Sequence, residues 1–421
     1  MGARQARADV ANFAVAACER EAYIGRMATR ELAVQPTRTT LRNGATEFPG
    51  RLLCLDVYRG LMVAAMIIVD NPGSDENAYW PIMHAKWNGW TPADFIFPSF
   101  LFLVGISLVY SFDARRRRGE TGKQILSHVF KRSLILIAVG MLVNASPIYG
   151  LDVHTWRFEG VTQRIALCYL FAAILELWTG RRGQVLGVLG CLLGYWALLR
   201  FVPVPGAGLP GRDIPFMDQV QNLPAWLDRK VFMGHLYDGS RDPEGLIHTI
   251  PAIGTTLIGV LTGHWLKSKR SASQLIGGMA LFGAVGMLAG ELWNHWFPIN
   301  KNLWTSSFAL FSAGLAAQTL AVFHWLVDVR GWRGWARPLV AYGRNPLVAY
   351  FLSVGLDALL TRVTITGSGS LKGIVYRSAF VPWLRPCCGA ETASLGYAIA
   401  YVILWGVVLG EMSRRRIFIR I

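Results

Sequence analysis

The sequence lacks the glycine, cysteine and histidine patterns that identify many soluble enzymes. Its 44 glycines are scattered and form no Walker-type or Rossmann phosphate-binding loop. No group of histidines and cysteines has the spacing of metal ligands, so no metal is expected. The six cysteines form no disulfide framework, since Cys168 and Cys191 lie inside apolar runs and Cys387 and Cys388 are adjacent. No internal repeat of half-transporter length is present.

Acidic residues are scarce, and the position of the excess positive charge is informative. The chain has 42 Lys and Arg against 26 Asp and Glu, a net charge of +16. No nucleic-acid-binding motif accompanies this charge, so no nucleic-acid partner is expected. The basic residues instead form short clusters between apolar runs, as in cytoplasmic loops under the positive-inside rule. These clusters are Arg115 to Arg118, Arg181–Arg182, Lys267–Lys269–Arg270, Arg330–Arg333–Arg337 and Arg414–Arg416.

Apolar runs long enough to cross a bilayer recur along the chain, and 53% of its residues are hydrophobic. They predict an all-α integral membrane fold with about ten transmembrane helices, both termini cytoplasmic and every strong basic cluster after residue 100 inside. The expected location is the cytoplasmic (inner) membrane. The predicted spans are 55–71, 93–112, 127–145, 161–179, 184–203, 248–266, 272–291, 304–326, 338–360 and 394–412.

Residues 1–50 differ from the rest, because they contain neither a sustained apolar run nor a signal-peptide h-region. A disordered cytoplasmic segment, a loose amphipathic segment and a mis-assigned start codon are all compatible with this composition. Residues 51–421 are expected to form one transmembrane domain.

The first predicted hairpin carries the residues with the clearest chemical meaning. Asp56 and Arg59 are three apart, so on a helix they share a face and can pair. Asp70 and Asn71 end the same span. His84 in the following loop precedes Asp94 by ten residues. Asp94 could orient the imidazole and leave its second nitrogen as a general base, although an interfacial histidine without a chemical role is the alternative.

Other polar groups stand at predicted membrane boundaries. Trp87, beside Asn88, could stack on a sugar ring or belong to an interfacial aromatic belt. Gln163 and Arg164 open a span, where Arg164 could meet a polar acceptor or anchor to lipid headgroups. A short outer loop contains amide, ammonium, indole and hydroxyl groups that suit a polyhydroxylated ligand or, alternatively, helix capping. These groups belong to Asn300, Lys301, Trp304 and Thr305.

A basic region marks the predicted cytoplasmic entry of the 338–360 span. Arg344 and Asn345 lie there, close in sequence to Arg337. A phosphate-rich donor such as coenzyme A could bind at this position, although the positive-inside rule alone also predicts basic residues here.

Five segments resemble the heparan-α-glucosaminide N-acetyltransferase family, within the transmembrane acyltransferase superfamily. They follow one another in order over roughly residues 51–412. The first is the hairpin from LDVYRG at 55–60 to FPSF at 97–100. The others are GVTQRIA at 160–166, DPEGLIHTIPAI at 242–253, PINKNLWTSS at 298–307 and YGRNPL at 342–347.

The resemblance implies an acetyl-CoA-dependent acyltransferase, with His84 as the catalytic histidine and Asp94 as the acidic residue beside it. Asp70 stands where many members carry Asn, so Asn71 is the expected amide donor. The acceptor is expected to be an amino sugar or related glycan at the extracytoplasmic face. The remaining polar groups of the hairpin and outer loops are expected to bind substrate, and Arg337, Arg344 and Asn345 to bind acetyl-CoA.

Two other functions fit the same residues. A transporter of sugars or sugar conjugates would also use intramembrane Asp, Arg and Asn, without covalent chemistry. A catalytically silent structural subunit is the third reading. The lipid bilayer is an expected partner in each case, and the sequence leaves open a homodimer.

Overall fold

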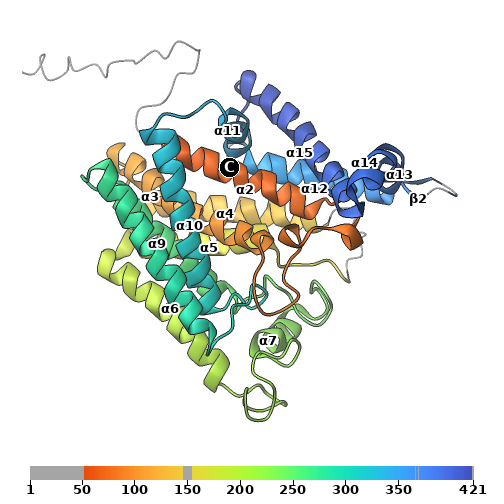
Figure 1. Ribbon diagram of the computed structural model, residues 1–421. Coiled ribbons are helices and arrows are strands. Elements are labelled where there is room, and N and C mark those ends of the chain that lie inside the picture. The colour runs from red at the N-terminus through yellow and green to blue at the C-terminus, as the bar shows by residue number, and fades with distance from the viewer. Residues whose placement is uncertain (1–51, 146–153, 366, 368, 420–421) are drawn as a thin grey trace, which may run out of the picture. The chain divides into compact units, whose positions relative to one another are not determined.

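The computed structural model describes residues 52–145, 154–365, 367 and 369–419, and the regular secondary structure of this part is almost entirely helical (Figure 1). The long helices are α2 (Leu53–Asp70), α3 (Ile96–Arg117), α4 (Gly122–Asn144), α5 (Val161–Trp178), α6 (Arg181–Phe201), α8 (Thr249–Leu266), α9 (Ala272–Asn294), α10 (Ser306–Phe323), α12 (Pro346–Arg362) and α15 (Ala390–Arg414). Shorter helices are α7 (Leu223–Phe232), α11 (Arg337–Arg344), α13 (Leu371–Ala379) and α14 (Val381–Cys388). The strands β1 (Thr364–Ile365) and β2 (Gly369–Ser370) pair antiparallel, with Thr364 opposite Ser370.

The all-α integral membrane class predicted from the sequence is confirmed. Seven helices of the described residues are long and apolar enough to cross a membrane. Nine of the ten predicted spans coincide with one long helix each, within a few residues. The count of ten crossings and the cytoplasmic placement of the termini stay predictions, and the expectation for residues 1–50 lies outside the described residues.

One predicted span is wrong in its continuity. The segment 338–360 is not a single helix, because α11 ends at Arg344 and α12 begins at Pro346. Asn345 between them has φ −127° and ψ 50°, outside the helical region. The proline ring disfavours helical backbone at the residue before it, which accounts for the break. The span 304–326 also changes character, since α10 continues as a π-helix, His324–Val329.

Five loops meet at one end of the helical bundle, which we call the loop end. The loop after α2 reaches the loop before α10, where Lys301 Nζ lies 3.0 Å from His84 Nδ1. It also reaches the α6–α8 connection, through a hydrogen bond of 3.1 Å from Trp87 to the Met217 carbonyl. The α4–α5 connection reaches the α6–α8 connection through the hydrogen bond from Arg157 to Asp242. The connection before α15 lies beside the loop after α2, because Tyr79 bonds to Thr392 in the first turn of α15. With both termini inside, the ten predicted spans place these five loops on the side of the membrane opposite the basic clusters, and α7 belongs to one of them (Figure 1).

Glycines bring two pairs of helices into backbone contact. A Cβ atom on Gly60 of α2 would lie 1.8 Å from the carbonyl oxygen of Leu339 in α11, and one on Gly343 would lie 1.9 Å from that of Asp56. Helices α3 and α8 meet in the same way, since a Cβ on Gly259 would lie 2.1 Å from the Phe102 carbonyl oxygen. Small residues allow such close approach of helices in membranes. The glycines Gly60 and Gly343 therefore place α2 directly against α11.

Candidate functional site

The carboxylate of Asp94 is held by the loop that precedes it. Its Oδ2 atom accepts hydrogen bonds of 3.0 Å from the backbone amides of Ala85 and Thr91, and one of 3.2 Å from the Thr91 hydroxyl. The side chain is only 1% exposed. A carboxylate with this many donors has one available orientation, and its other oxygen, Oδ1, faces the loop residue His84.

His84 is oriented by this carboxylate, as the sequence predicted it could be. Its Nδ1 atom lies 2.8 Å from Asp94 Oδ1, and its side chain is 47% exposed. An ionised carboxylate only accepts hydrogen bonds, so Nδ1 carries the proton and Nε2 keeps its lone pair. The exposed imidazole can therefore take a proton at Nε2 from a bound substrate.

Lys301 is the third member of this cluster. Its ammonium lies 3.3 Å from Asp94 Oδ1, and 3.0 Å and 3.3 Å from His84 Nδ1 and Nε2. The ion pair with Asp94 therefore holds the ammonium beside the imidazole ring.

The loop of His84 and the loop of Lys301 are joined along their backbones. Gly89 N donates to the Ile299 carbonyl at 2.8 Å, and the Asn300 side-chain amide donates to Asn88 Oδ1 at 3.2 Å. Asn300 Oδ1 accepts from Leu303 N at 2.8 Å. The amides of Asn88 and Asn300 thus hold the two loops together and set the place of His84 against Lys301.

The end of α2 faces the same cluster. The Asp70 carboxylate lies within electrostatic reach of His84, Lys301 and Asp357. Asn71 is buried, and its side-chain amide donates to the Ile67 carbonyl at 2.8 Å, which caps the helix. In this arrangement the carboxylate of Asp70 interacts electrostatically with the cluster, and the side-chain amide of Asn71 is occupied by the Ile67 carbonyl.

The other residues predicted to contact substrate at this end are buried. Trp304 Nε1 donates to the Thr255 hydroxyl at 3.2 Å, and Thr305 accepts from Phe308 N at the start of α10. Arg164 is 1% exposed, lies with Cζ 5.2 Å from the Trp304 ring centre and donates to the Gly245 carbonyl. Helix capping and internal packing account for these contacts, and their role in binding stays a prediction.

Gln163 is buried as well, and its amide donates to the Phe158 carbonyl at 3.1 Å. Neither Gln163 nor its neighbour Arg164 reaches a headgroup-facing surface, so the alternative of a lipid anchor is disfavoured.

A charge network that sequence reasoning did not assign lies beside Arg164. Arg157 donates to the Asp242 carboxylate at 2.7 Å and also contacts Glu244. Glu159 is buried nearby, and burial raises its pKa to about 7. Asp228 of α7 is fully buried, and desolvation raises its pKa to about 7 as well. The DPEG segment was a sequence signal for the acidic half of this network. Its arginine partner could not be predicted, because Arg157 is 85 residues away from Asp242 in the chain.

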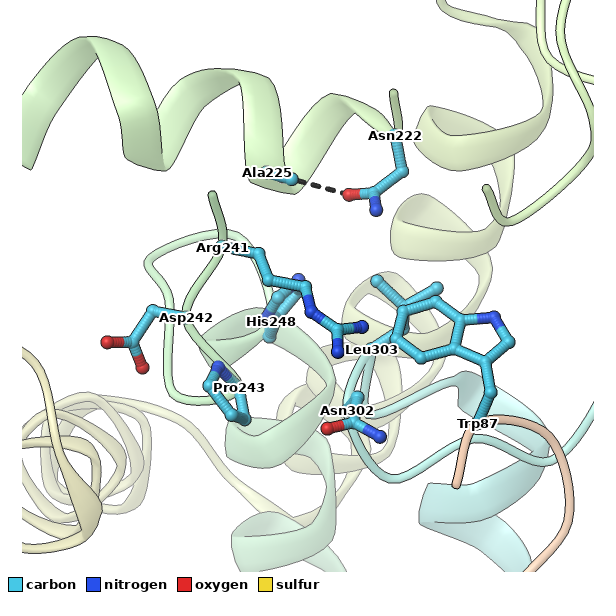
Figure 2. A pocket seen from close by; sticks show the side chains of 9 residues that line it. All are labelled: Trp87, Asn222, Ala225, Arg241, Asp242, Pro243, His248, Asn302 and Leu303. Carbon is cyan, nitrogen blue, oxygen red and sulfur yellow. Dashed lines mark hydrogen bonds between the residues drawn. The ribbon is translucent and has the colours of Figure 1, made fainter. Parts of the chain in front are cut away.

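A small pocket opens next to this network, between the loops that follow α2, α6 and α9 (Figure 2). The side chains of Trp87, Arg241, His248 and Asn302 converge on it. Of these, the sequence had singled out only Trp87.

At the opposite end of the bundle, which we call the basic end, the predicted pair of Asp56 and Arg59 is confirmed at 3.5 Å. Arg59 also donates to the Ser107 hydroxyl at 2.8 Å and to the Gly343 carbonyl at 3.5 Å. Helix α11 therefore lies directly against this pair.

The residues predicted to bind acetyl-CoA lie at this end. Asn345 is buried and bonds to the backbone of Ile417 and Ile419 near the C-terminus. Arg337 is exposed at the start of α11. Arg344 Nε is buried without a hydrogen-bond partner in the described part of the chain, so it is an available donor.

The structure also assembles three metal-ligand side chains that the sequence gave no reason to group. Cys54, His324 and Asp328 have ligand atoms within 4.8 Å of one another. The His324 ring contacts Asp328 Oδ2 at 3.0 Å and Cys54 Sγ at 4.0 Å, both through Nδ1.

Comparison with known proteins agrees with the resemblance in the motifs. Residues 51–290 match the family model described as heparan-alpha-glucosaminide N-acetyltransferase, catalytic. The chain is 30% identical over 370 residues to the human heparan-alpha-glucosaminide N-acetyltransferase, and 28% identical over 352 residues to the mouse protein. These alignments cover 75% and 71% of this chain. The chain spans about half the length of both relatives, 54% and 53% respectively.

Proposed function

Because the chain belongs to the heparan-alpha-glucosaminide N-acetyltransferase catalytic family, we propose that it transfers an acetyl group from acetyl-CoA to the amine of an amino sugar. The observation that carries the proposal is the cluster of His84, Asp94 and Lys301, in which a buried carboxylate orients a half-exposed imidazole beside an ammonium group. The loop end would face outside the cytoplasm and receive the sugar.

The cluster supports a direct transfer in which His84 is the general base. His84 Nε2 accepts the proton that the amine loses while the nitrogen–carbon bond to the acetyl group forms. The carbon–sulfur bond then breaks, and the thiolate takes up a proton as coenzyme A leaves. The ammonium of Lys301 beside the ring can stabilise the negative charge on the carbonyl oxygen in the transition state. In the alternative, His84 Nε2 itself takes the acetyl group as the carbon–sulfur bond breaks, and the amine then displaces the imidazole as its own bond to the acetyl group forms.

Helix α2 links the two substrates in this proposal. Asp56 and Asp70 are 14 residues apart on it, which corresponds to ~21 Å of helix. Acetyl-CoA would keep its phosphates at the basic end, near Arg337 and Arg344, because charged groups are costly in hydrocarbon. Its long pantetheine arm would run past Arg59 toward His84.

Incubation of the purified protein with radiolabelled acetyl-CoA and a panel of amino sugars tests this function. Label should appear on at least one sugar and should disappear for the His84→Ala variant. Accumulation of unmodified sugar inside proteoliposomes, with no labelled product, would instead favour the transporter. The silent-subunit reading requires that neither process occurs.

A further inference from the structure

Three side chains with metal-ligand atoms meet at the basic end of the molecule. Cys54 is the second residue of α2, whereas His324 and Asp328 belong to the π-helix that follows α10. Their ligand atoms all lie within 4.8 Å of one another. The sequence predicts no metal here, because Cys54 is 270 residues away from His324 in the chain.

The π-helix brings two of the three ligands to one side. His324 Nδ1 lies 3.0 Å from Asp328 Oδ2, four residues further along the chain. Residues four apart share a side of a helix. Turns of π-helix are rare and occur frequently at functional sites. In this segment the change from α-helix to π-helix falls at His324 itself, so the irregular backbone coincides with the first ligand.

The distances within the group are close to those around a shared tetrahedral ion. Zinc binds a thiolate sulfur at ~2.3 Å and an imidazole nitrogen or carboxylate oxygen at ~2.0–2.2 Å, so two ligands of one ion are ~3.3–3.8 Å apart. His324 Nδ1 lies 3.0 Å from Asp328 Oδ2 and 4.0 Å from Cys54 Sγ. One imidazole nitrogen thus faces both other ligands, and side-chain shifts below ~1 Å would bring all three to bonding distance.

The group is enclosed, and its carboxylate has no basic side chain beside it. Cys54 is 0% exposed and His324 is 6% exposed, with apolar residues of α2 and α10 packed around them. Within the described part of the chain, Asp328 forms an ion pair with His324 and with no lysine or arginine. Asp56 also lies within electrostatic reach of Cys54, but it is paired with Arg59. A dication with one thiolate and one carboxylate ligand has no net charge, which lowers the cost of burial.

We propose that Cys54, His324 and Asp328 bind one Zn²⁺ ion. Thiolate, imidazole and carboxylate are all zinc ligands, and water would complete the tetrahedron. The thiolate disfavours Mg²⁺ and Ca²⁺, which take oxygen ligands. On binding, the Cys54 thiol releases its proton to solvent, and His324 carries its own proton on Nε2.

The ion would fasten the first turn of α2 to the segment that leads into α11. It is separate from the proposed acetyl transfer, because 16 residues, or ~24 Å of helix, lie between Cys54 and Asp70. A metal that binds only the folded protein stabilises it. Zinc should therefore raise the Tm of the wild-type protein above its value in EDTA, and Cys54→Ser should abolish this difference.

Metal analysis of the full-length protein tests the site directly. The protein is purified with an affinity tag that contains no histidine, loaded with Zn²⁺ and transferred into metal-free buffer. The wild type should retain about one zinc ion per chain. Cys54→Ser and His324→Gln should each lose it. Cys191→Ser and His295→Gln are the matched controls and should retain it, since neither residue belongs to the group.

Cobalt substitution identifies the ligands in the wild-type protein, where no variant has to fold. Co²⁺ in place of Zn²⁺ should give the near-ultraviolet absorption of a thiolate–cobalt bond and the visible bands of a tetrahedral ion. Asp328→Asn, at a side chain that is 15% exposed, should lose the bound cobalt. No retained metal in the wild type, or equal retention in Cys54→Ser, would mean that the three groups only bond to one another, and the inference would be wrong. These measurements do not use acetyl transfer, so they stand apart from the proposed function.

Discussion

Asp94 gives the candidate site its geometry at the scale of single residues. Three donors from one short loop bind Oδ2, while His84 and Lys301 share Oδ1. The imidazole is therefore oriented by a group that solvent does not reach. The aspartate thus positions the ring, and the proposal assigns contact with the substrate to the histidine.

Substitution of these two residues should give different losses of activity. His84→Ala should lower kcat by at least ~10²-fold, because the base or acyl acceptor is gone. Asp94→Asn should reduce kcat less, since the ring loses its orientation but keeps its lone pair. Steady-state acetyl transfer measures both, with the exposed His295→Ala as a control at the same end. Near-normal turnover in well-folded His84→Ala protein would remove this residue from the mechanism.

Glu159 predicts a pH dependence of stability. Burial raises its folded pKa to about 7, above the ordinary range of an unfolded glutamate near 4.5. A raised pKa favours the fold below the unfolded value, and this contribution is lost as pH rises through about 7. Between pH 6 and pH 8 the loss is ~1–2 kcal/mol. Glu159→Gln should therefore show a smaller fall in Tm over this interval than the wild type.

Thermal unfolding in detergent at several pH values measures this difference. The exposed Glu76→Gln variant, located on another loop of the same end, should follow the wild-type curve. Equal pH slopes for Glu159→Gln and the wild type would show that the carboxyl is charged in the folded protein at pH 6.

At the scale of elements, the contact between α2 and α11 joins the helix that leads to the loop end with the helix that carries Arg344 at the basic end. Gly60 and Gly343 let the two backbones meet, and Arg59 bonds to the Gly343 carbonyl. The break at Asn345 then turns the chain into α12. A continuous helix over 338–360 would keep residues 346–360 on the axis of α11, so the break gives α12 a direction of its own.

Gly343→Ala should destabilise the protein. The added methyl would lie 1.9 Å from the Asp56 carbonyl oxygen, and backbone cannot move aside as a side chain can. Overpacking of this kind costs ~1–3 kcal/mol, which for a protein of this size predicts a Tm lower by ~1–3 °C. Gly355→Ala in α12 is the matched control, because its methyl would meet nothing within 4 Å. An unchanged Tm for Gly343→Ala would mean that the α2–α11 contact is looser than described.

At the scale of the whole molecule, five loops at one end and basic clusters at the other divide the chain into two sides. The loop end contains His84, and the basic end contains Arg344 and the Arg115 cluster. The proposal therefore requires the acetyl group to pass between the two sides of the membrane.

Sealed inside-out vesicles test this requirement. Acetyl-CoA added outside such vesicles should acetylate an impermeant amino sugar trapped within, because the basic end then faces the bath. Radiolabel in the trapped sugar is the readout. Reporters fused after Arg118 and near Asp218 should give cytoplasmic and exterior signals respectively, which checks the orientation independently. Transfer that occurs only with both substrates on one side would rule out passage across the bilayer.

The sequence by itself determined the membrane class, the helix positions and the family. Long apolar runs, one-sided charge and ordered motifs are local in the chain, and each can be read without knowledge of distant contacts. The same locality explains the correct pairs, since Asp56 with Arg59 and His84 with Asp94 are at most ten residues apart. The Asn345–Pro346 pair is a local signal for the break between α11 and α12. The apolar run around it nevertheless predicts one continuous span, because length and hydrophobicity alone do not register the pair.

Only the tertiary structure decided which distant groups meet. Lys301 reaches His84 across 217 residues, and Arg157 reaches Asp242 across 85. Burial, too, is a property of the assembled loops, so the sequence could not separate Trp304 and Arg164, which are enclosed, from His84, which is open.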